Sequence, residues 1–155
     1  MSTIRSWEDR DLPWLERIMT DCFGDPPEVT RHFHRAFLRP GTCLVAEAEG
    51  HAVGAIYLLP GPSLSLAPKT LQSVYLYAFV ILPAFRHRGM GTLLYQSALT
   101  QARSRADCVC VIPASEDLMH LYGTFAPLAP LGSVRKARYS PDVLAASPPF
   151  FGRWI

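Results

Sequence analysis

The stretch "YLYAFVILPAFRHRGMGTLLYQSAL", from Tyr75 to Leu99, decides the fold of this 155-residue chain. Its first half belongs to an aromatic and β-branched run, 71–82, which predicts a central strand buried on both faces. Its second half carries apolar residues at helical spacing and predicts a helix from Gly91 to Arg103. Two glycines and three basic or near-basic side chains lie between these elements. The function therefore depends on what this junction binds.

The junction, from Arg86 to Gly91, is suited to hold an anion. Gly89 and Gly91 lie where the helix begins, so unpaired backbone N–H groups and the positive end of the helix dipole face outward. Glycine lets a ligand approach the backbone closely, and arginine adds charge-assisted hydrogen bonds to phosphate oxygens. The side chains that could contribute are Arg86, His87, Arg88 and Thr92. The spacing fits neither the NTPase nor the dinucleotide pattern, and the motif alone is equally consistent with a basic turn in solvent.

The composition favours a single folded domain over residues 1–155. Apolar residues make up 49% of the chain and charged residues 18%, which excludes a disordered chain. The net charge is only +2, and basic residues cluster only around Arg86 and at 135–138, so we expect no nucleic-acid partner. The longest apolar run, 74–85, is too short to cross a bilayer, and the N-terminus lacks a signal-peptide run. We therefore expect a cytoplasmic protein without a membrane partner.

Cysteine and histidine do not indicate a metal site. Cys108 and Cys110 form an isolated C-x-C pair, for which buried thiols are the commoner explanation. His32 and His34 lie two residues apart on a predicted helix, so they point to different faces and cannot chelate one ion together. We expect both histidines to face solvent or line a groove, and we expect no bound metal.

The remaining patterns predict helices packed on a mostly antiparallel sheet. One helix should run from Leu12 to Gly24, with Asp11 as its N-cap, and a second should lie within 25–40. The apolar face predicted for the second helix is Val29, Phe33 and Phe37. Strands are predicted at 3–6, 42–48, 52–59 and 107–113, with a turn at 49–51 and a loop at 62–70. Ser115 should cap a last helix whose apolar face is Leu118, Leu121, Tyr122 and Phe125.

The opening stretch resembles the acetyl-CoA-binding core of the GNAT superfamily of N-acetyltransferases. In that family a strand leads through a proline to (Arg/Gln)-x-x-Gly-x-(Gly/Ala), and the next helix receives a pyrophosphate on its N-terminus. The matching positions here are 79–83 and 86–91. The segment "CVIPASEDLMHLYGTFAPL", 110–128, resembles the family's fifth strand and following helix. The resemblance runs from Thr3 to about Phe125 and implies an α/β (α+β) fold, with a mixed, mostly antiparallel central sheet flanked by about four helices.

This resemblance implies direct transfer of an acetyl group from acetyl-CoA, the cosubstrate, to a primary amine of a small molecule, amino acid or peptide in a ternary complex. The backbone of Phe79, Val80 and Ile81 would pair with the pantetheine arm beside a bulge and polarise the thioester carbonyl. Ser115 occupies a position where the family often has an asparagine that contacts the arm. The residues that would surround the pyrophosphate are Arg86, His87, Arg88, Gly89, Met90, Gly91 and Thr92.

Tyr122 matches the tyrosine that often protonates the departing CoA thiolate in the family. A phenol has a pKa of ~10 and a thiol a pKa of ~8.5, so the tyrosine stays protonated near neutral pH. Tyr122 also fits the apolar face of its helix, as an ordinary core tyrosine would.

The acceptor side of the site is less defined. Tyr75, Tyr77 and Phe79 alternate onto one face of the central strand, where they would line either a substrate groove or the core. Tyr75 stands where some members of the family have a glutamate base. The remaining candidates for a base acting through water are Glu47, His32 and His34.

Three functions stay open at this point. The first is an N-acetyltransferase, and the second is a GNAT-like module that binds acyl-CoA with little or no catalysis, as Ser115 and the missing glutamate suggest. The third is nucleic-acid binding by the two basic clusters, which predicts that the affinity for nucleic acid depends steeply on salt.

The proline-rich segment 126–155 departs from the family pattern, although "SVRKARYS" and "FFGRWI" are candidate strands. This segment would shape the acceptor pocket, pair with a second subunit in a homodimer, or run over the surface.

Overall fold

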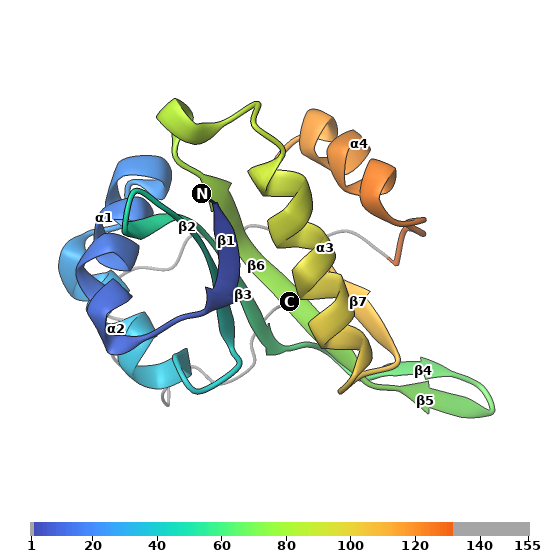
Figure 1. Cartoon of the computed structure of the whole chain (residues 1–155). Coiled ribbons are helices and arrows are strands. Elements are labelled where there is room, and N and C mark those ends of the chain that lie inside the picture. Colours follow the sequence, from blue (N-terminus) through green and yellow to red (C-terminus); the bar gives the residue numbers. More distant parts are fainter. Residues whose placement is uncertain (1, 132–155) are drawn as a thin grey trace. The chain divides into compact units, whose positions relative to one another are not determined.

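The computed structural model describes residues 2–131 (Figure 1). The chain divides into two compact units, one ending at Pro113 and the other beginning at Ala114, and each is described by itself. The single domain expected over 1–155 stays a prediction, and the candidate strands of the tail lie outside the described residues. Within the described part, no helix is long and apolar enough to cross a membrane.

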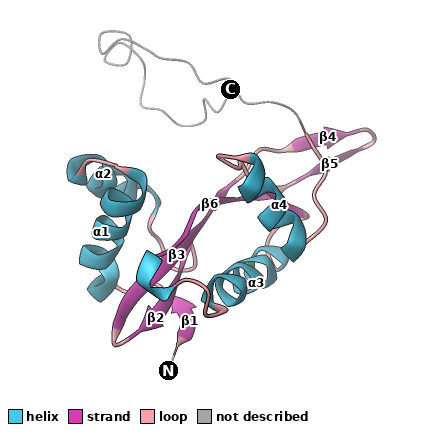
Figure 2. Cartoon of the chain, turned by 90° about the horizontal axis from the view of Figure 1, so that it is seen from above, coloured by secondary structure: helices cyan, strands magenta, loops and turns pink. Residues whose placement is uncertain are grey.

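A five-stranded sheet forms the centre of the first unit, in the order β1-β2-β3-β6-β7. Its strands are β1 (Thr3–Ser6), β2 (Cys43–Ala48), β3 (His51–Pro60), β6 (Ser73–Ile81) and β7 (Cys108–Cys110). Neighbouring strands are antiparallel except β6 and β7, which are parallel. The predicted mixed, mostly antiparallel sheet is therefore confirmed (Figure 2).

Helices cover both faces of this sheet, with α1 and α2 on one face and α3 on the other (Figure 2). Their bounds are α1 (Leu12–Phe23), α2 (Pro27–Phe37) and α3 (Met90–Arg103), with α4 (Glu116–Phe125) in the second unit and short 3-10 turns η1 (Asp9–Asp11) and η2 (Pro83–Phe85). Gly24 ends α1 as predicted, because its φ of 73° suits glycine and its N–H reaches the carbonyls of Met19 and Thr20. The number of α-helices found agrees with the expected one.

Three local elements differ from the sequence prediction. The expected loop at 62–70 contains a small second sheet, β4 (Leu64–Leu66) paired with β5 (Lys69–Leu71), because the leucines alternate with polar residues although prolines flank them. The turn before β3 has two residues, Glu49 and Gly50, both with positive φ, as in a type I′ hairpin. The last expected strand is shorter than 107–113, and its residues are only half-buried.

The helix α2 buries a face that agrees only in part with the predicted one: Phe33 and Phe37 pack against the core cluster as predicted, but Val29 does not. Val29 is 52% exposed, whereas Thr30 and His34 are buried. The Nε2 atom of His34 lies 2.8 Å from the hydroxyl of Tyr57 on β3 and is satisfied by this hydrogen bond, whereas the buried Nδ1 atom has no hydrogen-bond partner among the described residues. The two histidines were expected to face solvent or line a groove: His32 is exposed, and the buried His34 lines the pocket between α1 and α2 described below.

An ionic cluster joins β1, β2 and the start of α1. The carboxylate of Asp11 is 1% exposed and accepts hydrogen bonds from Arg5 Nη1 and Nη2 at 2.7 and 2.9 Å and from the Glu8 N–H at 2.8 Å. Asp11 stands at the N-cap position of α1, but its side chain makes no capping bond to that helix. Glu47 joins the cluster by accepting a hydrogen bond from Arg5 Nε at 2.6 Å. The carboxylate of Asp11 therefore ties down β1 instead of the helix.

We expect the folded state to lose stability as the pH falls below about 6.5, because of His34. Burial lowers the pKa of His34 from 6.5, outweighing the opposite effect of Glu16, so the folded protein holds the imidazole neutral. The unfolded chain then binds more protons, and this contribution is present above pH 6.5 and lost as the pH falls from 6.5 toward the lowered pKa. Urea unfolding at pH 7.5 and 5.0 measures the loss. The loss of stability between the two pH values should be smaller in His34→Gln and unchanged in the matched control, His32→Gln. An equal loss in both variants would contradict the role of His34.

Candidate functional site

A bulge interrupts the central strand β6. Ala55 of β3 pairs with Val80, but Tyr57 pairs with Tyr77, so the one residue between them on β3 faces both Ala78 and Phe79. Ala78 takes up the extra residue with a φ of 51°, a left-handed conformation that is uncommon for alanine. The bulge expected from the resemblance therefore exists, and it lies at Ala78.

The bulge moves Phe79 to the opposite face of the sheet from Tyr77. The Tyr77 ring centroid lies 5.4 Å from that of Phe33 on α2, whereas the Phe79 centroid lies 5.3 Å from that of Tyr95 on α3. The prediction that Tyr75, Tyr77 and Phe79 share one face is therefore wrong for Phe79. The physical reason is that one extra residue shifts the two-residue alternation of a strand by one position.

The edge of β6 that follows Tyr75 has no strand beside it among residues 2–131. The partner β7 reaches only from Ser73 to Tyr75. The Leu82 N–H donates to the Val53 carbonyl at 2.8 Å, so the backbone N–H and C=O groups of Leu82 point toward β3. Because this direction alternates along a strand, the N–H and C=O groups of Ile81 point away from β3. The Ile81 carbonyl accepts a hydrogen bond from Arg86 Nε at 2.8 Å, which agrees with this alternation. The backbone of Ile81 thus lies at an open edge, where an extended ligand can pair.

The loop after β6 presents the N-terminus of α3. His87 and Gly89 both have left-handed φ values, 60° and 78°, and the helix begins at Met90, one residue before the predicted start. The first backbone hydrogen bond of α3 joins the Leu93 N–H to the Gly89 carbonyl at 3.1 Å. Three N–H groups come before this bond, on Met90, Gly91 and Thr92, and a Gly N-cap offers no side chain to them. They form a seat for an anion.

Basic side chains surround this seat. Arg86, His87 and Arg88 are exposed, and the Arg86 guanidinium is held by its bond to the Ile81 carbonyl. The Arg88 guanidinium lies 5.5 Å from the centre of the Phe85 ring, which fixes its direction. The Arg86 guanidinium therefore lies at the strand edge of Ile81, the Arg88 guanidinium lies over Phe85, and the open N-terminus of α3 follows in the same segment.

The second unit contains the other two predicted residues. Ser115 caps α4 as predicted, because its Oγ accepts the Leu118 N–H at 3.3 Å. Tyr122 is buried, and burial raises the pKa of its phenol above 10. Leu121, which was expected on the same apolar face, is 41% exposed.

Two of the three candidate bases, Glu47 and His34, are hydrogen-bonded to other side chains, and the third, His32, is exposed. Glu47 accepts hydrogen bonds from Arg5 at 2.6 Å and Arg10 at 3.1 Å, and His34 is bonded to Tyr57. Tyr75 and Tyr77 are half-buried on the α1–α2 side of the sheet, where they pack against the core cluster. For residues 2–131, no group of His, Cys, Asp and Glu side chains could hold a metal ion.

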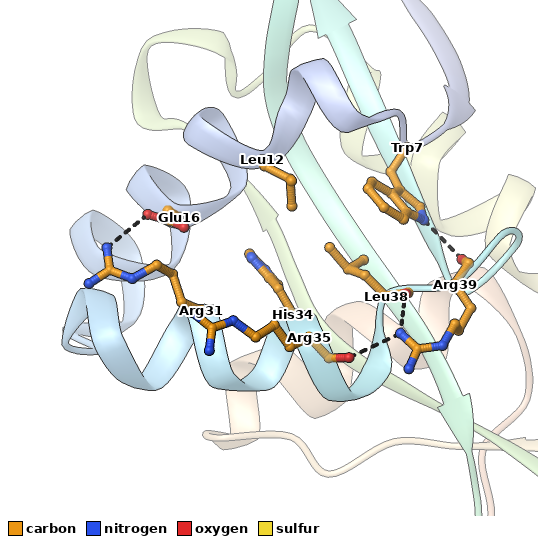
Figure 3. Close-up of a pocket in the computed structure, with 8 residues that line it drawn as sticks. All are labelled: Trp7, Leu12, Glu16, Arg31, His34, Arg35, Leu38 and Arg39. Carbon is orange, nitrogen blue, oxygen red and sulfur yellow. Dashed lines mark hydrogen bonds and ion pairs between the residues drawn. The ribbon is translucent and has the colours of Figure 1, made fainter.

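A pocket of about 290 Å³ lies between α1, α2 and the segment after β1 (Figure 3). It is lined by Trp7, Leu12, Glu16, Arg31, His34, Arg35, Leu38 and Arg39. Its polar groups bond mostly to the protein itself: Trp7 Nε1 donates to the Arg39 carbonyl at 2.9 Å, Arg39 Nη1 donates to the carbonyls of Arg35 and Leu38, and Arg31 pairs with Glu16 at 3.5 Å. Apart from His34, no residue proposed from the sequence lines it.

Sequence reasoning missed one group beside the predicted substrate tyrosines. Burial raises the pKa of the Tyr77 phenol, and the negative charge of Asp25, in the link between α1 and α2, raises it further. No periodic pattern joins a short link to a strand about fifty residues later, so only the folded structure reveals this effect.

Comparison with known proteins gives a consistent result. The model of the "Acetyltransferase (GNAT) family" matches residues 3–125. None of the proteins of curated function that were compared matches this sequence significantly.

Solved structures share the fold at low sequence identity. The structure of AAC(6')-Iy with the bisubstrate analogue CoA-S-monomethyl-acetylneamine is 15% identical, with a TM-score of 0.72, covering 90% of this chain and 99% of that one. The aminoglycoside 6'-N-acetyltransferase AAC(6')-IG from Acinetobacter haemolyticus is 15% identical, with a TM-score of 0.71 and coverage of 89% and 99%. A transcriptional regulator from Bacillus halodurans C-125 is 17% identical, with a TM-score of 0.70 and coverage of 90% and 100%.

Proposed function

Because this chain belongs to the GNAT acetyltransferase family, we propose that it transfers an acetyl group from acetyl-CoA to a primary amine of a small molecule, amino acid or peptide. The observation that carries the proposal is the combination of an open strand edge at Ile81 with the free N-terminus of α3 and its two arginines. A structural relative solved with a CoA-containing bisubstrate analogue supports acetyl-CoA as the cosubstrate.

The residues present fit such a cosubstrate. An amide-bearing arm can add to the open edge of β6 through the Ile81 N–H, as an extra strand does. The N–H groups of Met90, Gly91 and Thr92 suit a pyrophosphate, and Arg86 and Arg88 add charge. A Cβ at Gly91 would lie 3.5 Å from Phe79 Cζ, so the strand side of this turn is closely packed and the seat faces outward.

The proposed reaction is a direct substitution at the thioester. Acetyl-CoA supplies the acetyl carbonyl carbon: the amine nitrogen bonds to it, the C–S bond breaks, and the thiolate leaves and takes up a proton. We assign Tyr122 as the proton donor, since burial raises the pKa of its phenol and keeps it protonated at neutral pH. The amine gives its own proton to solvent before or during attack.

Release of free CoA tests the proposal. The full chain is incubated with acetyl-CoA and a panel of primary amines, and the thiol that appears is measured with a thiol reagent. We expect release to depend on the presence of an amine. Binding of acetyl-CoA without release on any amine would overturn the enzymatic function.

That negative result would instead support an acyl-CoA-binding module with little or no catalysis. Two observations favour this second candidate. Glu47 is tied to Arg5 and Arg10, and the Oγ of Ser115 is used to cap α4, so neither is freely available to substrate.

We expect Arg86→Ala to weaken acetyl-CoA binding by about 10- to 100-fold, the value of one charged hydrogen bond at ~1.5–3 kcal/mol. Calorimetric titration of the folded variant measures the Kd. The matched control is Arg103→Ala, which removes an exposed arginine from the other end of α3 and should leave the Kd unchanged. An unchanged Kd for Arg86→Ala would show that the seat does not bind the pyrophosphate.

A further inference from the structure

The pocket of about 290 Å³ between α1 and α2 lies at the end of this helix pair that is remote from the link joining the two helices. Leu12 begins α1 and Leu38 follows α2, and both line the pocket together with Trp7 from the segment after β1 (Figure 3). The residues of β6 and of the anion seat, 75–92, do not line it. The pocket is therefore separate from the site proposed for acetyl transfer.

One side of this pocket is apolar. The side chains of Trp7, Leu12 and Leu38 converge on it (Figure 3). Trp7 Nε1 already donates to the Arg39 carbonyl at 2.9 Å, so the indole offers its apolar surface to a ligand. Because covering apolar surface that is open to water favours binding, this side suits the hydrocarbon part of a small molecule.

The other side of the pocket is positively charged. Arg31 and Arg35 lie one turn apart on α2 and Arg39 follows the helix, whereas Glu16 is the one acidic residue among the described residues that line the pocket. Arg31 pairs with Glu16 at 3.5 Å, and Arg39 Nη1 donates to two carbonyls at the end of α2. No carboxylate within residues 2–131 pairs with the Arg35 guanidinium. Three guanidinium groups against one carboxylate favour an anionic ligand.

His34 gives an independent indication of a ligand. Its side chain lines the pocket and points from α2 toward the α1 side (Figure 3), it is only 5% exposed, and its Nδ1 atom has no hydrogen-bond partner in the described part of the chain. Nε2 bonds to the Tyr57 hydroxyl. An imidazole nitrogen accepts a hydrogen bond better than a phenol oxygen does, so Tyr57 donates to Nε2 and the proton of the neutral ring lies on Nδ1. A buried N–H without a partner is costly, and a ligand oxygen in the pocket would satisfy it.

We propose that this pocket binds a small organic carboxylate with an apolar body. The carboxylate accepts hydrogen bonds from the His34 Nδ1–H and from the Arg35 guanidinium. The apolar body packs on Trp7, Leu12 and Leu38. A neutral ligand would leave Arg35 unpaired, and inorganic phosphate would leave the apolar side open to water. The site has no part in the proposed acetyl transfer, so the inference does not depend on that function.

The first test compares three probes on the full, unmodified chain by calorimetric titration at neutral pH. Benzoate carries the carboxylate and an apolar body, benzamide is its uncharged counterpart, and inorganic phosphate is an anion without an apolar body. We expect benzoate to bind at least about 10-fold more tightly than either of the others, the value of one charged hydrogen bond. Equal affinity for benzoate and benzamide, or for benzoate and phosphate, would overturn the proposed ligand class.

The second test locates the bound benzoate with two arginine variants. Arg35→Ala should weaken benzoate binding by about 10-fold or more, and the exposed position of Arg35 allows the variant to fold. The matched control is Arg86→Ala, which removes an exposed arginine beside the anion seat of α3 and should leave the Kd for benzoate unchanged. The reverse pattern would place benzoate in the anion seat, and equal effects would show attraction by surface charge alone; either result overturns the pocket.

The third test examines His34 in the unmodified chain by NMR. The resonance of its Nδ1–H proton is identified by its absence from His34→Gln. We expect this resonance to move downfield when benzoate is added, because the proton gains a carboxylate acceptor. A resonance that does not respond at a benzoate concentration that saturates the chain would overturn the site as proposed.

Discussion

We expect Tyr122→Phe to lower kcat about 100- to 1,000-fold while the Kd for acetyl-CoA stays unchanged. The substitution keeps the buried ring and removes the hydroxyl that would give its proton to the thiolate, and general acid catalysis contributes about 10²–10⁴-fold. Steady-state CoA release gives kcat, and calorimetry gives the Kd. Because burial raises the pKa of Tyr122 above 10, the acid form is present across neutral pH and is lost only as the pH rises beyond that value.

The matched control for this variant is Thr124→Val, which also removes one hydroxyl from α4. The Thr124 hydroxyl donates to the Leu121 carbonyl within the helix, so its loss should change kcat by about two-fold or less. If Tyr122→Phe behaves like this control, Tyr122 is a packing residue and the proton comes from solvent.

We expect Asp11→Ala to lower the free energy of unfolding by about 3–5 kcal/mol, the cost of leaving one charge of a buried pair alone. The variant removes the acceptor of two Arg5 bonds and of the Glu8 N–H, all at a position that is 1% exposed. Urea unfolding at pH 7 measures the change.

Burial alone would raise the pKa of Asp11, but the Arg5 and Glu8 hydrogen bonds outweigh it and the pKa is lowered. This stabilisation is therefore present above pH 3.8 and is lost as the pH falls through the lowered pKa.

The control for Asp11 is Asp9→Ala in the same 3-10 turn. Asp9 is exposed, so its removal should change stability by about 0.5 kcal/mol or less. A loss below about 1 kcal/mol for Asp11→Ala would mean that Glu47 and solvent satisfy Arg5 without it.

Elements with local signals could be predicted from the sequence, whereas those set by distant contacts could not. Gly24 ends α1 and Ser115 caps α4 because both effects act within a few residues. The buried face of α2 includes His34, which bonds to Tyr57 twenty-three residues away, and leaves Val29 exposed, and helical spacing alone indicates neither. The pairing of Leu64 with Leu71 was not predicted, because the prolines of this segment are typical of a loop.

The candidate site divides in the same way. The anion seat from Arg86 to Thr92 is one continuous motif between a strand and a helix, so its composition and its geometry could both be inferred. The face of Phe79 could not, because a bulge leaves no mark in the two-residue alternation of side chains. The effect of the Asp25 charge on the pKa of Tyr77 could not be predicted either, because no spacing rule connects the two residues.

The left-handed residue Ala78 has a consequence for how this protein can change. By shifting the alternation of β6, it sends Tyr77 toward α2 and Phe79 toward α3, so two residues that would share a face in a regular strand lie on opposite sides of the sheet. Under the proposed acetyl transfer, with the acceptor on the Tyr77 side, libraries that randomise this side should alter which amines are accepted and leave cosubstrate binding unchanged. Acceptor range and cosubstrate affinity become separately selectable traits, divided by a single inserted residue.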